Sequence, residues 1–145
     1  MVRTALAAAL LLAGTGPGAT TPANPDYTCA LRHRGAIYDS LKALPPDFQA
    51  TVRGSVGAMA DRGEFFNATD VILRPAPGRR FIRAGVSGSY RYLWYEQGGI
   101  AYGKEIVIFA TDPSGTAHVA ADIRATGQDL CVQTDALLGT PLERR

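Results

Sequence analysis

The sequence is poor in the residues from which recognisable catalytic and metal sites are built. Its 145 residues include two histidines and two cysteines. His33 and His118 are too few and too far apart for a zinc site of familiar spacing. Neither a phosphate-binding glycine loop nor a dinucleotide-binding fingerprint occurs. These absences argue against metal-dependent and nucleotide-dependent enzymes, and we expect no metal ion and no cofactor.

An excess of charge of one sign is also missing. The chain has 15 basic and 13 acidic residues, a formal net charge of +2. Arg3 is the one charged residue before Asp26, so removal of an N-terminal leader would lower this charge to +1. Nucleic-acid-binding domains carry a concentrated basic surface. We therefore expect no nucleic-acid partner.

No apolar run is long enough to cross a membrane. The longest, residues 5–13, is well short of the roughly 20 residues that a transmembrane helix needs. Arg3 precedes this run and small residues follow it, which is the pattern of a secretory signal peptide. We therefore predict a signal peptide over residues 1–23, cleaved after Ala19 or Ala23, and an exported protein that is periplasmic or secreted.

The leader sequence also predicts whether the mature protein is anchored to a membrane and which kind of organism it comes from. Thr15 stands where a bacterial lipoprotein carries its lipid-modified cysteine, so we expect no membrane anchor after signal removal. A short leader rich in alanine and glycine is typical of a bacterial protein. The remaining residues, 24–145, suffice for one globular domain and are too few for two ordinary ones.

Cys29 and Cys131 are the only cysteines in the chain. In an oxidising compartment an even pair near opposite ends of a domain is most simply one disulfide. It would close a loop of about a hundred residues and tie the two ends together. The alternative is two free thiols, one of them reactive, but the chain has no Cys-x-x-Cys motif to support it.

The order of the predicted elements is that of an α+β fold. Apolar spacing predicts a helix from Cys29 to Leu44, a stop at Pro45-Pro46 and a second helix from Asp47 to Gly63. Residues 129–138 fit either a short helix or a last strand. We expect the two N-terminal helices to pack on one face of a roughly five-stranded antiparallel meander sheet. Its strand-like runs, separated by short turns, are residues 70–74, 79–86, 90–96, 100–110 and 116–124.

The turns predict which side chains share a face of this sheet. If Gly98-Gly99 is a two-residue turn, Tyr95 lies opposite Tyr102; the next turn, of four residues, places Phe109 opposite Val119. One face is then almost wholly apolar and is assigned to the core: Tyr90, Tyr92, Trp94, Val107, Phe109, Val119, Ala121 and Ile123. The other face is mixed and is assigned to solvent: Arg91, Leu93, Tyr95, Tyr102, Lys104, Ile106, Ile108, His118, Asp122 and Arg124.

The face assigned to solvent is the preferred functional surface. Arg91, Tyr95, Tyr102 and Arg124 form its binding set, because tyrosine and arginine dominate many recognition surfaces. The leading hypothesis is a non-enzymatic binding or interaction module for a protein or glycan partner. The simpler interpretation is that these side chains only stabilise the sheet by cross-strand pairing.

Glu96 and Glu105 are the acidic exceptions on the face assigned to the core. They either lie at its rim or pair with Arg80 or Arg83. If the two carboxylates were buried side by side, one pKa would rise and the pair would become a candidate catalytic site.

Two weaker hypotheses therefore stand beside the binding module. A small hydrolase-like enzyme would use His118 with Asp122, or the Glu96–Glu105 pair, for acid–base chemistry. An inhibitor or a structural protein of the cell envelope is the other. On balance we expect a protein that is not an enzyme.

Overall fold

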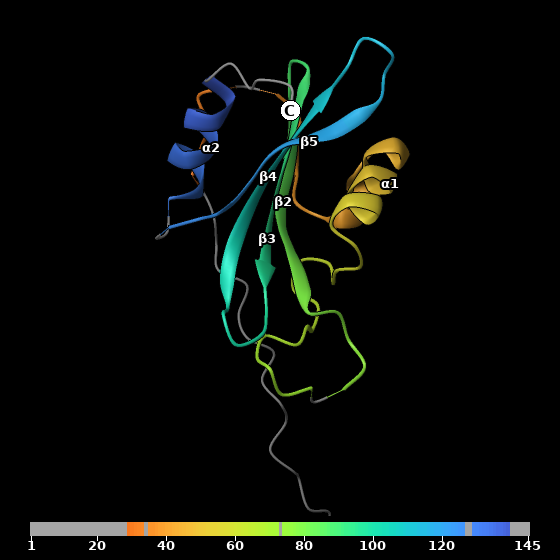
Figure 1. The fold of residues 1–145 in the computed structure, drawn as a ribbon, viewed down its shortest axis with the longest axis vertical. Coiled ribbons are helices and arrows are strands. Elements are labelled where there is room, and N and C mark those ends of the chain that lie inside the picture. Colours follow the sequence, from red (N-terminus) through yellow and green to blue (C-terminus); the bar gives the residue numbers. More distant parts are fainter. Residues whose placement is uncertain (1–28, 34, 73, 127–128, 140–145) are drawn as a thin grey trace, which may run out of the picture.

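A five-stranded antiparallel sheet forms the centre of the structure (Figure 1). The computed structural model describes residues 29–33, 35–72, 74–126 and 129–139, so the predicted signal segment lies outside the described residues. Each strand pairs with the next one along the chain, which confirms the predicted antiparallel meander. The strands are β1 (Ile37–Tyr38), β2 (Arg79–Ser87), β3 (Tyr90–Gln97), β4 (Gly103–Thr111) and β5 (Ala117–Arg124).

The first strand is not the one that the sequence pattern predicts. The run after Asp70 stays outside the sheet, and β1 comes instead from the segment expected to be a helix from Cys29 to Leu44. That helix prediction is wrong, because the segment forms β1 and a single 3-10 turn, η1 (Leu41–Ala43). Its apolar spacing is overridden by pairing with the edge of β2. The approach is close: a Cβ at Gly35 would lie 1.5 Å from the carbonyl oxygen of Val86.

The second predicted helix exists but is shorter than expected. It is α1 (Pro46–Ser55), which begins one residue before the predicted start at Asp47. It ends before Gly57, whose φ of +93° is a left-handed conformation that glycine adopts without strain. The Gly57 N–H donates to the Val52 carbonyl at 3.3 Å and closes the helix. The predicted end at Gly63 therefore lies two turns too late, although Val56 still packs against the same core.

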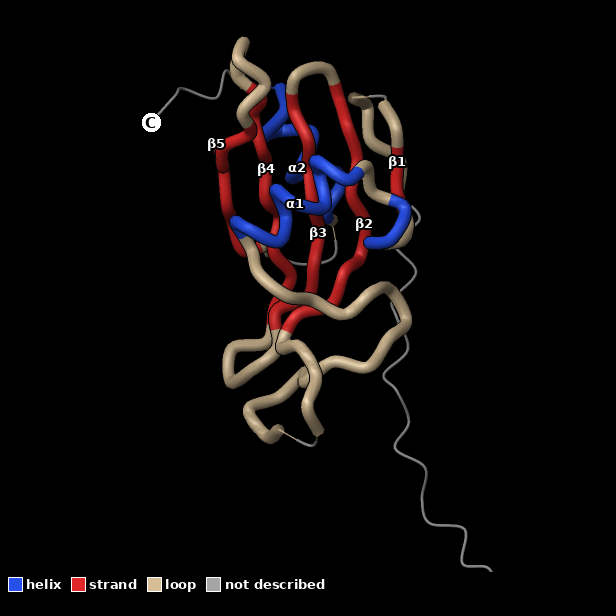
Figure 2. The backbone as a smooth tube through the Cα atoms, turned by 90° about the vertical axis from the view of Figure 1, so that its right-hand side faces the viewer, coloured by secondary structure: helices blue, strands red, loops and turns tan. Residues whose placement is uncertain are grey.

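The two observed helices, α1 and a C-terminal one, lie on opposite faces of the sheet, whereas the prediction placed two N-terminal helices on one face (Figures 1 and 2). The C-terminal segment is the helix α2 (Leu130–Gly139), which settles the choice between helix and strand. On one face, Phe48 and Val52 of α1 join a buried cluster that includes Phe81, Leu93, Val107 and Phe109. On the other, Leu130 and Leu138 of α2 join a cluster that includes Ile82, Trp94, Ile106 and Ile108. The central strands are apolar on both faces because both faces are covered.

The register of the β3–β4 hairpin differs from the predicted one and changes which side chains share a face. Tyr95 pairs with Glu105, not with Tyr102, and Trp94 pairs with Ile106. The β3–β4 connection thus has five residues, 98–102, and the register differs from the predicted one by three positions. An odd shift moves every β4 side chain to the opposite face. The β4–β5 hairpin has the predicted register beside its turn, with Phe109 opposite Val119, and a bulge between Ile108 and Phe109 then shifts the pairing by one residue, so that Ile108 lies opposite Ala121.

A disulfide joins Cys29 to Cys131, as predicted, and ties α2 to the segment before β1. The two cysteines are 102 positions apart, a separation for which chain entropy gives at most about 4–5 kcal/mol of stabilisation. The bond is consistent with an oxidising compartment. In the part of the chain that the structure describes, neither helix has the length and apolar character needed to span a bilayer.

Candidate functional site

Most of the candidate residues gather at one end of the sheet, shown at the bottom of Figure 1. We call this region the loop end: it comprises the loops 56–78 and 98–102 and the strand ends beside them. Two rows of residues that are neighbours across the strands lie here. One row is Arg80, Glu96 and Lys104, and the other is Phe81, Tyr95, Glu105 and Arg124. Six candidates belong to it: Tyr95, Glu96, Tyr102, Glu105, Asp122 and Arg124.

Arg91 lies near the opposite end of the sheet and holds α1 in place. Its Nη2 contacts the Asp47 carboxylate at 2.6 Å, and its guanidinium lies 5.2 Å from the centre of the Phe48 ring. The hydrogen bond from Arg91 is the main cause of the lowered pKa of Asp47. These contacts join a helix to the sheet, so the structure supports a stabilising role for Arg91.

His118 is also remote from its proposed partner. It pairs with Ala110 near the start of β5, whereas Asp122 lies beside Val107, four residues further along the strand. At about 3.3 Å per residue the two are separated by roughly 13 Å along β5. The structure therefore does not bring His118 and Asp122 together as an acid–base pair.

Glu96 and Glu105 lie on opposite faces, since Glu105 shares a row with Tyr95 and Glu96 follows Tyr95 on the strand. Arg80 Nε contacts Glu96 at 2.6 Å, and both side chains are buried. Arg124 Nε contacts Glu105 at 2.8 Å. Each carboxylate therefore faces its own arginine, and the two do not form a shared catalytic dyad. Arg80 is one of the two partners that the sequence proposes for these acids.

The buried pair also positions Tyr102. The Tyr102 hydroxyl donates to Glu96 at 2.5 Å, and the Arg80 guanidinium lies 4.5 Å from the centre of the Phe66 ring. Tyr102 remains half exposed, with 49% of its surface accessible. The hydroxyl end of this side chain is thus held at the sheet while the rest of it is available for contact.

A second polar cluster lies on the face that carries α1. Burial raises the pKa of Tyr95, and the Asp122 and Glu105 carboxylates add to this effect while Arg79 opposes it. Burial and the Glu105 charge likewise raise the pKa of Asp122. Tyr95 is itself only 6% exposed, so it is not the open binding residue that the sequence predicts. Arg79 was not anticipated, because its place in this cluster depends on the β2–β3 register.

The loop end also carries an exposed apolar group that sequence reasoning missed. Seven large apolar side chains are exposed among the described residues, and four of them are here. We call them the apolar tip: Val71, Ile72, Ile100 and Tyr102, with exposed fractions of 59%, 77%, 91% and 49%. The sequence feature that could have revealed this group is the presence of apolar residues in loops, where polar residues are usual.

The two loops that carry the apolar tip are bonded to each other. The Gly99 N–H donates to the Ala68 carbonyl at 3.2 Å. Asn67 Nδ2 donates to the carbonyls of Arg74 and Ala76 at 3.1 and 2.8 Å, closing the longer loop on itself. A Cβ at Gly98 would lie 2.0 Å from the Asn67 carbonyl oxygen, so the two backbones approach closely. The apolar tip is therefore carried by two loops that hydrogen bonds hold together.

No family model matches the chain, and no curated protein or solved structure matches it. Within the described residues, no three His, Cys, Asp or Glu side chains are grouped so as to hold a metal ion. The loop end remains the surface on which apolar, aromatic and paired charged side chains converge.

Proposed function

We propose that the protein is an exported, non-enzymatic interaction module whose loop end binds a partner protein. The apolar tip is the observation that carries this proposal, because four exposed apolar side chains gather on two mutually bonded loops. Exposed apolar groups rimmed by polar residues mark interaction sites. Tyr102 is the central contact residue, since tyrosine is enriched among residues that dominate binding energy.

The surroundings of the tip fit a protein interface. Interfaces combine an apolar centre with a polar rim. Arg124, half exposed and paired with Glu105, supplies such a rim together with Asp122. A small preorganised patch of this kind loses little conformational entropy on binding.

A protein suits this site better than a membrane or a glycan. The loop 56–78 carries three acidic and two basic residues, whereas anionic lipid surfaces attract clusters of basic ones. Of the two tyrosines expected to form an open aromatic platform, Tyr95 is buried and Tyr102 remains. The glycan partner that the sequence allowed therefore has less support.

Export is part of the proposal. A basic start, an apolar run and small residues over positions 1–23 support a signal peptide. The Cys29–Cys131 disulfide is consistent with an oxidising compartment. On this basis residues 24–145 act in a bacterial periplasm or in the medium.

The proposal is tested by placing charge on the tip. Ile72→Asp with Ile100→Asp removes two side chains that are 77% and 91% exposed, so the fold should persist. Burying each in an interface contributes about 1.5–3 kcal/mol, so partner affinity should fall about a hundredfold or more. The matched control is Val132→Asp on α2, a site 60% exposed and outside the loop end.

The assay is site-specific photo-crosslinking in the native envelope fraction, followed by affinity measurement with the isolated partner. A crosslinker at position 100 should give a protein adduct, and one at position 132 should not. The same adducts from both positions, or unchanged affinity for the doubly charged variant, would refute the proposal. Tip-dependent sedimentation with phosphatidylglycerol vesicles would replace the protein partner by a membrane surface.

A further inference from the structure

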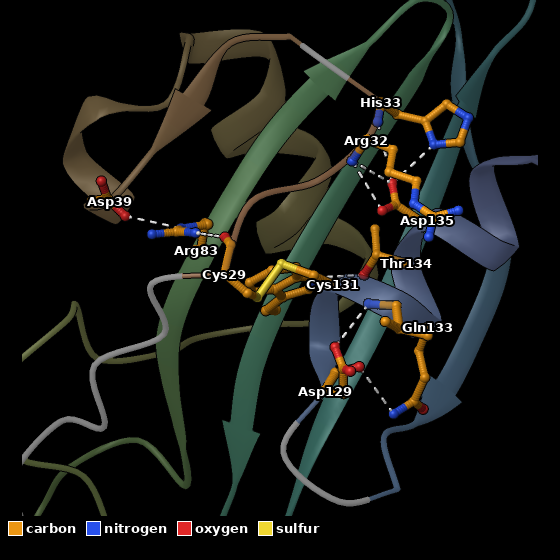
Figure 3. Close-up of a disulfide and its surroundings, with 12 residues drawn as sticks. Cys29, Arg32, His33, Asp39, Arg83, Asp129, Cys131, Gln133, Thr134 and Asp135 are labelled. Atoms are coloured by element: carbon orange, nitrogen blue, oxygen red, sulfur yellow. Dashed lines mark hydrogen bonds and ion pairs between the residues drawn. A yellow bond between two sulfur atoms is a disulfide. The ribbon is translucent and has the colours of Figure 1, made fainter.

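The two edges of the sheet differ in how readily they can accept a further strand. At one edge, β1 has only two residues. The segment around it is tied down by the Cys29–Cys131 disulfide and by Arg83, which contacts the Cys29 carbonyl at 3.2 Å and Asp39 at 3.1 Å (Figure 3). At the other edge, β5 has eight residues and, among the described strands, pairs only with β4 (Figure 2). A long edge strand is a template for pairing with another chain, so β5 is the edge to consider.

The pairing of β5 with β4 shows which backbone groups of β5 face outward. The Ala125 N–H donates to the Lys104 carbonyl at 2.8 Å, so Ala125 directs its backbone groups toward β4. The pairing from Ala121 to Arg124 lies beyond the bulge and is regular. In an antiparallel strand, successive residues direct their N–H and C=O groups to alternate sides. The backbone groups of Asp122 and Arg124 therefore point away from β4, where no strand of the described residues pairs with them.

The side chains at these two positions have opposite charges and lie on the same face, the one that carries α1. A second, antiparallel β5 can pair with these outward backbone groups in more than one register. Registers that place Asp122 opposite Asp122, or Arg124 opposite Arg124, are disfavoured because like charges directly opposite each other destabilise a strand pair. The register between them places Asp122 of each copy opposite Arg124 of the other, with the two Ile123 residues opposite each other. The charges of this strand are therefore complementary to those of its own copy.

The surroundings of both side chains favour this register. Asp122 is exposed and makes no hydrogen bond or ion pair within the described residues. Burial and the Glu105 charge raise its pKa, so a nearby cation would stabilise the carboxylate. Arg124 Nε contacts Glu105 at 2.8 Å, but 48% of the Arg124 side chain is exposed and available for a second carboxylate. On the other face, Ile123 packs against the cluster beneath α2 and would extend it to the second copy.

We propose that the protein forms a two-fold symmetric dimer through β5, in which two sheets join into one. The contact has about four backbone hydrogen bonds, because each hydrogen-bonded residue pair of an antiparallel ladder exchanges two. It is small compared with the interfaces of stable dimers, so we expect a dissociation constant of roughly 10 µM to 1 mM. The dimer goes beyond the proposed partner binding: it uses Asp122 and Arg124 at the rim of that interface and no residue of the apolar tip.

The test combines two charge reversals. Asp122→Lys and Arg124→Glu each place two pairs of like charges in the contact, so each variant alone should dimerise about ten- to hundredfold more weakly. Mixing the two variants restores both pairs of opposite charges, so the heterodimer should have an affinity close to that of the native dimer. Arg32→Glu is the matched control, because Arg32 is an exposed arginine beside α2 and outside β5 (Figure 3).

Sedimentation velocity of the mature, oxidised protein measures the dimer from about 10 µM to about 1 mM. Asp122→Lys also guards against a folding defect, because it replaces repulsion by attraction toward Glu105 and should raise Tm while weakening the dimer. In the native protein, hydrogen exchange at the amides of Asp122 and Arg124 should slow as the concentration rises. In Asp122→Lys this change should be lost.

Three results would overturn the proposal. The first is a native protein that stays monomeric at about 1 mM, and the second is single variants that dimerise as strongly as the native protein. The third is a mixture of the two variants that associates no better than each variant alone. Ile72→Asp with Ile100→Asp should dimerise as the native protein does, so a failure of the partner-binding proposal leaves the dimer standing.

Discussion

The buried ion pair between Arg80 and Glu96 holds the loop end together, and its removal has a defined energetic signature. The two side chains are 1% and 2% exposed, and Nε lies 2.6 Å from Oε2. The informative set of variants is Arg80→Met, Glu96→Leu and the two combined. Each single change leaves a buried charge without its main partner, whereas the double change replaces the pair by apolar groups.

The expected magnitudes follow from desolvation. Breaking one side of a buried ion pair costs about 3–5 kcal/mol, because the remaining charge is left uncompensated. For a chain of this size that corresponds to a fall in Tm of roughly 6–20 °C. The double variant should lie close to the native protein, since apolar replacement of a whole pair is often neutral. The coupling energy between the two sites should therefore be at least about 3 kcal/mol.

Chemical unfolding of the oxidised protein measures these differences. Trp94 is the single tryptophan and is fully buried, so its fluorescence reports loss of the core. Tyr102→Phe serves as the control for the hydroxyl that donates to Glu96, and because Tyr102 is half exposed it should cost about 1 kcal/mol. Single variants that cost less than 1 kcal/mol, or a double variant as unstable as the sum of both, would refute the reasoning.

Two further predictions concern single positions. Asp61 accepts hydrogen bonds from Ser40 Oγ and the Leu41 N–H. Burial opposes ionisation of Asp61, but these hydrogen bonds outweigh it and lower the pKa of the carboxyl group. Asp61→Asn should therefore lower the free energy of unfolding by about 1–3 kcal/mol at pH 7. Because the folded pKa is depressed, this difference should shrink as pH falls below about 4, and urea titrations that show it constant from pH 7 to pH 3 would contradict the assignment. Gly85→Ala should lower the free energy of unfolding by about 1–3 kcal/mol, because the new methyl group would overlap Tyr92. Gly54→Ala lies in open space on α1 and should raise the free energy of unfolding by about 0.5–1 kcal/mol. Thermal unfolding that finds the Gly54 variant less stable than the Gly85 variant would exclude this account.

The long strands and the disulfide could be predicted from the sequence. The strands depend on neighbouring residues, and the disulfide depends only on the number of cysteines. The turn at Asp112–Gly115 has the proline and glycine that its geometry needs, with Gly115 at a φ of +86°, and the register across it is the predicted one. Two cysteines at opposite ends of the domain allow a single intramolecular pairing. Neither inference needs knowledge of distant parts of the chain.

The β3–β4 hairpin shows where local signals fail. Gly98-Gly99 resembles a two-residue turn. The structure instead requires a glycine at position 98 because the Asn67 backbone of the other loop approaches it too closely for a side chain. That cause lies 31 positions away, at Asn67, and cannot be recognised in the turn itself. The resulting shift of three residues reversed the predicted faces and concealed that Tyr95 is buried while Tyr102 is held by Glu96.

Residue order therefore sufficed for the four long strands, the register beside the β4–β5 turn and the cysteine pair, since each depends on a few neighbouring residues or on counting. Contacts between distant segments decided the rest. Pairing with β2 turned the start of the described chain from helix to strand, and burial of both sheet faces placed α1 and α2 on opposite sides. The same kind of contact bonded the loop of Ala68 to the loop of Gly99 and enclosed the Tyr92 hydroxyl, because each of these arrangements is a free-energy balance over the whole fold.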